Sequence, residues 1–233
     1  VINYEAPTGG LTLDYAIHPR WSNNDVYETW LSSHEPPPSF GAPDSRVWVL
    51  TSGVTEPSSF PILDIGSGTG RNALALARRG HPVDAIEMAA RFPELLLAEA
   101  ARDALPVRVI QRESFVTLEG LRRDYRLIVL SAVVPGFRGP EDLRAMFELA
   151  AQCLAPGGQL VFNTFIGRGG YTPDAAAHQL GQQFFTAIFT REDLAEAART
   201  TSLALVADDS VHEFERRHGD PQNWPPNDWY ERW

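Results

Sequence analysis

An acidic residue followed by alternating glycines is the part of the sequence best suited to chemistry. Asp64 stands near the end of an apolar run in "ILDIGSGTGRNALALA" and directly precedes a tight, glycine-rich stretch. The residues of that stretch are Gly66, Ser67, Gly68 and Gly70. Glycine lets the backbone turn sharply and lets a ligand approach without a Cβ in the way. Because the Asp64 carboxylate favours a cation over a phosphate, we expect this loop to bind a positively charged, phosphate-free ligand.

A second acidic residue ends the next apolar segment. Glu87 follows the loop by about 20 residues in "VDAIEM", a spacing at which a carboxylate can accept hydrogen bonds from both ribose hydroxyls. Met88 is suited to packing on an adenine ring, and Glu113, after the third apolar segment, to accepting a hydrogen bond from the adenine amino group. S-adenosylmethionine (SAM) carries an ammonium group, a sulfonium and a ribose without phosphate, so we predict it as the cofactor.

Strand and helix patterns alternate through the middle of the chain and must position these residues. The predicted strands cover 61–65, 82–88, 106–111, 125–134 and 157–165, with one or two more over 202–216. The predicted helices cover 71–80, 91–104, 140–155 and 190–200, and Thr190 with Asp193 resembles a capping box. Alternation with right-handed crossovers predicts an α/β, doubly wound, mostly parallel sheet of seven strands. Ligands bind such sheets beyond the carboxyl ends of the strands.

The segments that flank this alternating region have a different composition. Residues 1–60 are rich in Pro, Ser and aromatic residues, and we expect them to be irregular apart from a helix over 23–33 and an element over 44–53. We predict a single domain with an N-terminal helical and aromatic cap (1–56), a SAM-binding core (57–217) and an aromatic C-terminal tail (218–233).

Three motifs within residues 61–165 resemble the class I SAM-dependent methyltransferases, in particular small-molecule enzymes of the tellurite-resistance-like kind. They are "LDIGSGTGRNA", "VDAIEM" and the "LAPGGQLVF" turn and strand. The resemblance implies a Rossmann-like methyltransferase sheet. It also implies the following contacts: methionine-side contacts from Asp64 and the glycine loop, ribose binding by Glu87, and adenine contacts by Met88, Glu113 and Ser114. We add Ser131, just after the fourth apolar strand, to the predicted cofactor site.

Two residues depart from the family pattern, and one family motif is missing. Glu113 stands where Asp is commoner, which keeps an acceptor on a longer arm, and Arg126 stands where an Asp is often found. The fourth strand continues into "LSAVVPGF", not into an "NPPY"-like stretch. That absence argues against the enzymes that methylate a base or glutamine amide nitrogen.

Composition narrows the class of protein further. The net charge is −10, all 20 basic residues are arginine, and no basic cluster is present. Such a chain is a poor nucleic-acid binder, since phosphate neutralisation supplies much of that affinity. The single cysteine excludes an internal disulfide and a cysteine-based zinc site, the six histidines are scattered, and we expect no metal. We find no run of about 18 apolar residues and no secretory pattern, so we expect a cytoplasmic protein without a membrane span.

Aromatic residues gather near the two ends of the sequence. All six tryptophans lie in the first 48 or last 10 residues, at positions 21, 30, 48, 224, 229 and 233. Two interpretations remain open: an aromatic lid over the methyl donor, or a clasp that serves packing alone. On the first interpretation, the candidate substrate-binding residues are Trp21, Trp30, Tyr171 and Trp229.

A catalytic base is needed only when the acceptor must lose a proton before it attacks. The candidates are His18 and Tyr15 in "LDYAIHPRW", Asn163 at the end of the fifth strand and Tyr171 in the loop that follows it, with Asp14 as a weaker one. Each also has a structural alternative: His18 can cap a turn, and Asn163 can hold loop backbone.

The sequence thus predicts an enzyme that transfers a methyl group from SAM to a small molecule, at O, N, C or a soft heteroatom. The product would be S-adenosylhomocysteine (SAH). One alternative is a SAM- or SAH-binding partner or sensor without catalysis. A nicotinamide-dependent oxidoreductase fits less well, because the third glycine comes one residue too early for its motif and Asp64 would repel a pyrophosphate. The sequence does not indicate the acceptor or the oligomeric state.

Overall fold

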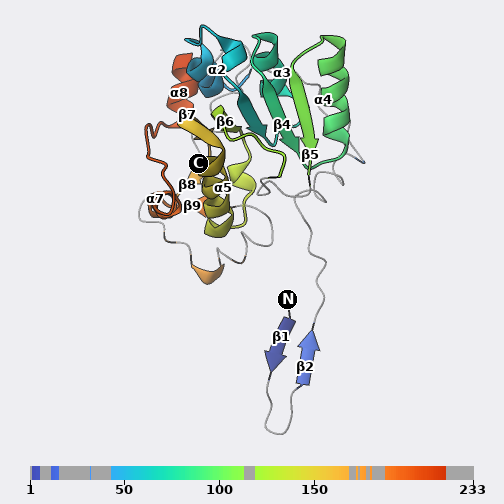
Figure 1. Ribbon diagram of the computed structural model, residues 1–233. Coiled ribbons are helices and arrows are strands. Elements are labelled where there is room, and N and C mark those ends of the chain that lie inside the picture. Colours follow the sequence, from blue (N-terminus) through green and yellow to red (C-terminus); the bar gives the residue numbers. More distant parts are fainter. Residues whose placement is uncertain are drawn as a thin grey trace.

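The chain folds around a central parallel sheet with helices on both of its faces, as the computed structural model shows (Figure 1). The structure describes residues 2–5, 12–15, 32, 43–112, 119–167, 172, 174–176, 179 and 187–218.

Strands and helices alternate through the core in the predicted order. The strands are β1 (Ile2–Glu5), β2 (Thr12–Tyr15), β3 (Ile62–Ile65), β4 (Val83–Glu87), β5 (Val107–Gln111), β6 (Tyr125–Leu130), β7 (Leu154–Phe162), β8 (Phe165–Ile166) and β9 (Ile188–Phe189). The α-helices are α2 (Ser45–Thr51), α3 (Arg71–Arg78), α4 (Arg91–Arg102), α5 (Pro140–Cys153), α7 (Arg191–Arg199) and α8 (Val211–His218). Two 3₁₀ turns, η1 (Pro57–Ser59) and η2 (Val134–Gly136), complete the set.

The central sheet has the strand order β5-β4-β3-β6-β7, and all its neighbouring strands are parallel. The chain runs from β3 outward to β5 and then crosses to β6 on the other side of β3. The order therefore reverses between β3 and β6. In doubly wound sheets a ligand binds at such a switch point, beyond the carboxyl ends of the two strands. The glycine loop follows β3, and Ser131 follows β6, so the topology brings both to that point.

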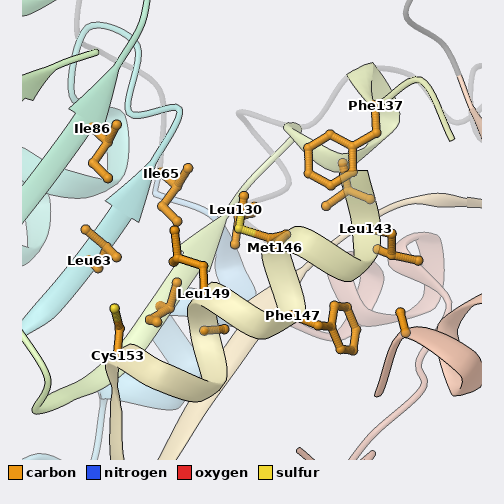
Figure 2. Close-up of a cluster of buried hydrophobic side chains, with 14 of the residues drawn as sticks. Leu63, Ile65, Ile86, Leu130, Phe137, Leu143, Met146, Phe147, Leu149 and Cys153 are labelled. Atoms are coloured by element: carbon orange, nitrogen blue, oxygen red, sulfur yellow. The ribbon is translucent and has the colours of Figure 1, made fainter. Parts of the chain in front are cut away.

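Alternate side chains of the strands point to opposite faces of the sheet and pack into two hydrophobic cores. On one face, Leu63, Ile65 and Leu130 pack with α5 residues such as Met146 and with Ala197 of α7. Figure 2 shows Met146 and Leu149 of α5 next to the strand side chains Leu130 and Ile65. Cys153, also in this core, is fully buried, and burial raises the pKa of its thiol.

The opposite face of the sheet holds the second core. There Ile62, Val83 and Val129 pack with α3, with Leu96 of α4 and with Val47 of α2. Helices therefore cover both faces, which confirms the doubly wound arrangement.

The helix ends follow local sequence signals. Pro140 occupies the first turn of α5, where its missing N–H costs nothing. At α7, the Thr190 hydroxyl accepts from the Asp193 N–H at 3.1 Å, and the Asp193 carboxylate accepts from the Thr190 N–H at 2.8 Å. The capping box predicted from the sequence is therefore confirmed.

Three sequence-based boundaries need correction. Residues 203–210 form no strand, and 211–218 form α8, so the strands predicted over 202–216 are wrong. Ser210 explains the change, since its carbonyl accepts from the Phe214 N–H and its hydroxyl lies 3.5 Å from the Glu213 N–H, as at a helix start. The apolar residues that suggested a strand there, Leu205 and Val206, are 81% and 79% exposed.

The central sheet accordingly has five strands in the described ranges, not the seven predicted. β6 ends at Leu130, four residues before the predicted end. β7 starts at Leu154, and its pairing with β6 jumps from Leu154 to Gln159. The Pro-Gly-Gly turn is therefore a bulge inside the strand, not a turn before it.

The first 60 residues also differ from the prediction. β1 and β2 pair antiparallel, with Ile2 opposite Tyr15 and Glu5 opposite Thr12, where an irregular chain was expected. Gly9 and Gly10 lie between them in the sequence, a hairpin signal that the prediction missed. Apart from Ser32, the helix predicted over 23–33 lies outside the described residues.

Candidate active site

The glycine loop joins the carboxyl end of β3 to the start of α3. Gly66, Gly68 and Gly70 all have positive φ angles, at 70°, 55° and 101°. A Cβ on Gly66 would stand 2.4 Å from a methyl carbon of Val133, so a side chain does not fit there. A Cβ on Gly68 would meet nothing within 4 Å, which leaves open space beside the loop. The two glycines thus have different roles. Gly66 lets Val133 pack against the backbone of the loop, and Gly68 borders space that a ligand can occupy.

Asp64 is a buried carboxyl group with a partner for only one of its oxygens. Its side chain is 1% exposed, and its Oδ2 has no hydrogen-bond partner among the described residues. Burial raises the pKa of Asp64 to about 7, against the opposing effect of Arg71 and a backbone hydrogen bond from Ala73. An unpaired polar atom at this depth costs free energy, and a cation bound beside it would remove that cost.

Glu87 ties the end of β4 to the glycine loop. One of its carboxylate oxygens accepts from the Gly68 N–H at 2.7 Å, and the other accepts from Met88 and Ala89 at 2.7 and 3.1 Å. Burial raises the pKa of Glu87, although these three hydrogen bonds oppose the change. A carboxylate offers about four acceptor positions. Glu87 therefore still has capacity for a ligand hydroxyl while it holds the loop.

A polar cluster, which we define as Asp44, Arg46, Arg71, Ser131 and Asn163, lies beside the loop. Asp44 pairs with Arg46 and accepts from the Ser131 hydroxyl at 2.7 Å. Ser131 in turn accepts from the Arg71 guanidinium at 2.9 Å. The Asn163 Oδ1 accepts from the Ala132 N–H at 2.7 Å and from Arg46 at 3.4 Å. The cluster therefore connects α2 and α3 with the carboxyl ends of β6 and β7.

The charge state of this cluster is set by its ion pair. Burial acts to raise the pKa of Asp44, but the hydrogen bonds and charge of Arg46, with the Ser131 hydroxyl, outweigh it and hold that pKa below its ordinary value. Asp44 therefore stays ionised under conditions in which Asp64 can hold a proton. Arg71, the first residue of α3, is exposed, and its guanidinium donates to Ser131.

A separate hollow of about 630 Å³ lies at the other edge of the sheet. Its lining includes Val83, Val107 and Arg108, at the amino ends of β4 and β5. It is therefore not part of the site formed at the carboxyl ends.

One protein family matches this region of the chain. Residues 62–158 match the family described as "Methyltransferase domain". The match begins with β3 and includes the glycine loop, Glu87 and Ser131. Less than half of the chain is thus similar to a methyltransferase domain. The match agrees with the methyltransferase resemblance found in the sequence motifs.

Solved structures support the fold of the methyltransferase domain. Geranyl diphosphate C-methyltransferase from Streptomyces coelicolor A3(2), solved with Mg²⁺, geranyl diphosphate and SAH, is 18% identical with a TM-score of 0.55, and the match covers 69% of this chain and 60% of that chain. A SAM-dependent methyltransferase from Methanosarcina mazei is 18% identical with a TM-score of 0.51, covering 65% of this chain and 82% of that one.

A third structure, reported under "Conversion of a Disulfide Bond into a Thioacetal Group during Echinomycin Biosynthesis", is 21% identical with a TM-score of 0.53. That match covers 63% of this chain and 60% of the other. The chain thus spans less than two thirds of the first structures it resembles. No curated protein sequence matches it.

The carboxyl edge of the central sheet brings together several residues predicted from the sequence. The carboxyl ends of β3 and β4 are surrounded by Asp64, by the glycine loop that contains Ser67, and by Glu87 and Met88. The Oγ atom of Ser67 is buried and has no hydrogen-bond partner among the described residues. Ser131 and Asn163 end β6 and β7, whose last paired residues are Leu130 and Phe162. Ser131 uses its one donor and one of its two acceptor positions inside the polar cluster, and the Asn163 side chain accepts from the Ala132 backbone N–H.

Other predicted residues cannot be placed. His18, Trp21, Trp30, Glu113, Ser114, Tyr171 and Trp229 lie outside the described residues. Asp14 and Tyr15 belong to β2, whose backbone alone is described. Trp48 of α2 is 43% exposed, and the Arg79 guanidinium lies 4.4 Å from its ring centroid. Trp48 thus packs with an arginine at the surface.

Two features are absent from the described ranges. Within them, no group of three or more His, Cys, Asp or Glu side chains has the arrangement of a metal site. No helix there has both the length and the apolar character that a membrane crossing needs.

Sequence reasoning missed three residues of the polar cluster. Asp44 is the N-cap of α2 and accepts from the Arg46 N–H, so "PDSRVWVL" carried a helix-start signal. Arg71 directly follows the last glycine of the loop, which places its charge at the site. These positions could have been named from the sequence, but the pairing of Asp44 and Arg46 with residues near 131 and 163 required the tertiary fold.

Proposed function

We propose that the protein transfers a methyl group from SAM to a small-molecule acceptor by in-line displacement. The observation that carries this proposal is the buried Asp64 carboxyl with its unpaired Oδ2 beside a glycine turn that Glu87 also holds. This arrangement favours a cationic nucleoside without phosphate over a dinucleotide. When bound, SAM supplies a methyl group that its positively charged sulfur activates.

The residues present fit this cofactor. Asp64 would accept from the ammonium group of the methionine part, and Glu87 would accept from the ribose hydroxyls. Arg71, held by Ser131 at the first position of α3, would pair with the carboxylate of the methionine part. Met88, half-buried after β4, would pack on the adenine, and Glu113 and Ser114 complete the proposed adenine contacts.

The chain's part in the reaction is alignment and exclusion of water. Aligned reactants lower the barrier strongly, and aromatic side chains keep water from a sulfonium centre. We therefore propose Trp21, Trp30, Tyr171 and Trp229 as acceptor contacts. For acceptors that must lose a proton, His18 and Tyr15 are the proposed bases. The acceptor atom is O, N, C or a soft heteroatom, and the motif resemblance favours the tellurite-resistance-like subtype.

Ligand binding provides the first test. We expect SAM and SAH to raise the melting temperature of the protein and NAD to leave it unchanged. Glu87→Ala should lose most of the SAM affinity in titration calorimetry, while Glu94→Ala, on the exposed side of α4, should retain it. Stabilisation by NAD alone, or equal affinity for both variants, would overturn the cofactor assignment.

Turnover provides the second test. Purified protein with SAM and a panel of small hydroxyl, amine, thiol and metalloid acceptors should accumulate SAH. SAH binding without turnover on any acceptor would instead identify a SAM- or SAH-binding partner or sensor. Trp21→Ala and Trp229→Ala should weaken acceptor turnover with normal SAH binding. Unfolding of these variants would indicate a packing clasp instead.

A further inference from the structure

Ala132 has a backbone conformation that its side chain disfavours. Its φ is +62°, and Ala104 at +49° is the other non-glycine residue with positive φ in the described ranges. The left-handed region costs an alanine about 1–2 kcal/mol relative to the right-handed one. Strain of this kind persists only where neighbouring groups hold it, and it gathers at functional sites. Ala132 lies two residues after β6 ends, at the sheet edge where the cofactor site forms.

Asn163 supplies the group that holds this conformation. Its Oδ1 accepts from the Ala132 N–H at 2.7 Å. Arg46 donates to the same oxygen at 3.4 Å and to the neighbouring Phe162 carbonyl at 3.3 Å. The end of β7 and the start of α2 therefore hold the backbone that follows β6.

The next residue transmits this arrangement to the glycine loop. A methyl carbon of Val133 lies 2.4 Å from the position that a Cβ of Gly66 would take, so Val133 packs directly on the glycine. If Ala132 left the left-handed region, the chain direction at Val133 would change and this contact would open. Gly66 is the first glycine after Asp64, and Gly68 beyond it donates to Glu87.

We propose that Asn163 is a positioning residue for the cofactor loop: it holds Ala132 left-handed, so that Val133 supports Gly66 in the binding conformation. Asn163 was a candidate base on the sequence, and this inference gives it a different role that needs no contact with reacting atoms. The inference rests on the proposed function, because it concerns how the loop receives SAM.

The expected effect follows from the left-handed penalty. Without Asn163, the penalty at Ala132 lowers the population of the binding conformation, and the apparent dissociation constant rises by the same factor. We expect Asn163→Ala to weaken SAH binding about 5- to 30-fold. Asn163→Asp keeps an acceptor oxygen and should bind SAH nearly as the wild type does.

Rescue by glycine is the decisive experiment. Ala132→Gly removes the left-handed penalty, so Asn163→Ala with Ala132→Gly should recover most of the SAH affinity in titration calorimetry. The matched control is Asn163→Ala with Ala104→Gly, which makes the same change at the other left-handed alanine and should recover nothing. Thermal melts of all variants would establish that each is folded.

Each outcome bears on the inference. Unchanged affinity in Asn163→Ala, or a loss that Ala132→Gly does not recover, would overturn it. Recovery by Ala104→Gly would overturn it too, since the effect would then be general stability. A wild-type protein that binds neither SAM nor SAH would instead refute the proposed function, and this inference with it.

Discussion

Cofactor binding should depend on pH through Asp64. Its carboxyl is fully buried, and burial raises the pKa of Asp64 to about 7. Near that pH the group is partly protonated in the free protein, yet it must be ionised to pair with the ammonium group of the ligand. Arg71 favours the charged form, while the negative charges of Glu87 and Asp44 oppose it. Binding below pH 7 therefore requires loss of the Asp64 proton.

The size of the effect follows from this pKa. With a pKa of about 7, roughly one tenth of Asp64 is ionised at pH 6 and roughly nine tenths at pH 8. The association constant for SAH should therefore rise about tenfold between these two pH values and level off above them.

Titration calorimetry in several buffers measures both the affinity and the protons released. The control is Asp64→Asn, which cannot ionise and should bind weakly with no such rise. The amino group of SAH also titrates, but it does so equally in the experiments on the wild type and on Asp64→Asn. The ratio of the SAH affinities of these two proteins at each pH therefore reports the titration of Asp64 alone. Parallel pH profiles for the two proteins would refute the reasoning, because Asp64 would then not exchange a proton when the ligand binds.

Three further predictions concern stability. First, the raised pKa of Asp64 means that the folded state holds this proton more tightly than the unfolded state, so the contribution of Asp64 to stability is full at low pH and is lost as pH rises through about 7. In urea unfolding, the unfolding free energy of Asp64→Asn relative to that of the wild type should therefore increase between pH 5 and 8. A constant difference between the two proteins would contradict this. Second, Gly66→Ala places a Cβ 2.4 Å from Val133 and should cost about 1–3 kcal/mol of unfolding free energy. The double variant Gly66→Ala with Val133→Ala should recover part of this loss. An equal loss in both variants would reject the contact as the cause. Third, Thr190→Ala removes the N-cap side chain of α7 and should lower the unfolding free energy by about 1 kcal/mol. Thr190→Ser keeps the hydroxyl and should lower it much less in the same denaturation assay. Equal losses in the two variants would show that the hydroxyl is not the cause.

Much of the core could be predicted because its signals are local. β3 and β4 are fully buried strands made mostly of apolar residues, and α3, α4 and α5 have one apolar face each. The capping box at Thr190 and Asp193 fixes the start of α7 within four residues. Asp64 and Glu87 could be named as site residues because parallel strands end at the same edge of a sheet.

The errors occurred where tertiary contacts override a local pattern. The "SLALV" segment has strand composition, but it pairs with no strand among the described residues and Ser210 starts a helix soon after. β6 was predicted too long because the apolar run continues through Ala132 to Val134. The left-handed turn at Ala132 depends on Asn163, 31 residues away. The Asp44–Arg46 pair likewise belongs to the site because Asp44 contacts Ser131 and Arg46 contacts Asn163. No sequence pattern links these residues.

The buried Cys153 makes this protein convenient for spectroscopy. It is the only cysteine in the chain, it is 0% exposed, and burial keeps its thiol protonated by raising its pKa. A maleimide dye would therefore react very slowly with the native protein as it stands. One cysteine introduced at an exposed position near the site, such as Ala90 beyond β4, would take up the dye selectively. Fluorescence from that single label could then follow cofactor arrival in real time, with no cysteine-free background to prepare.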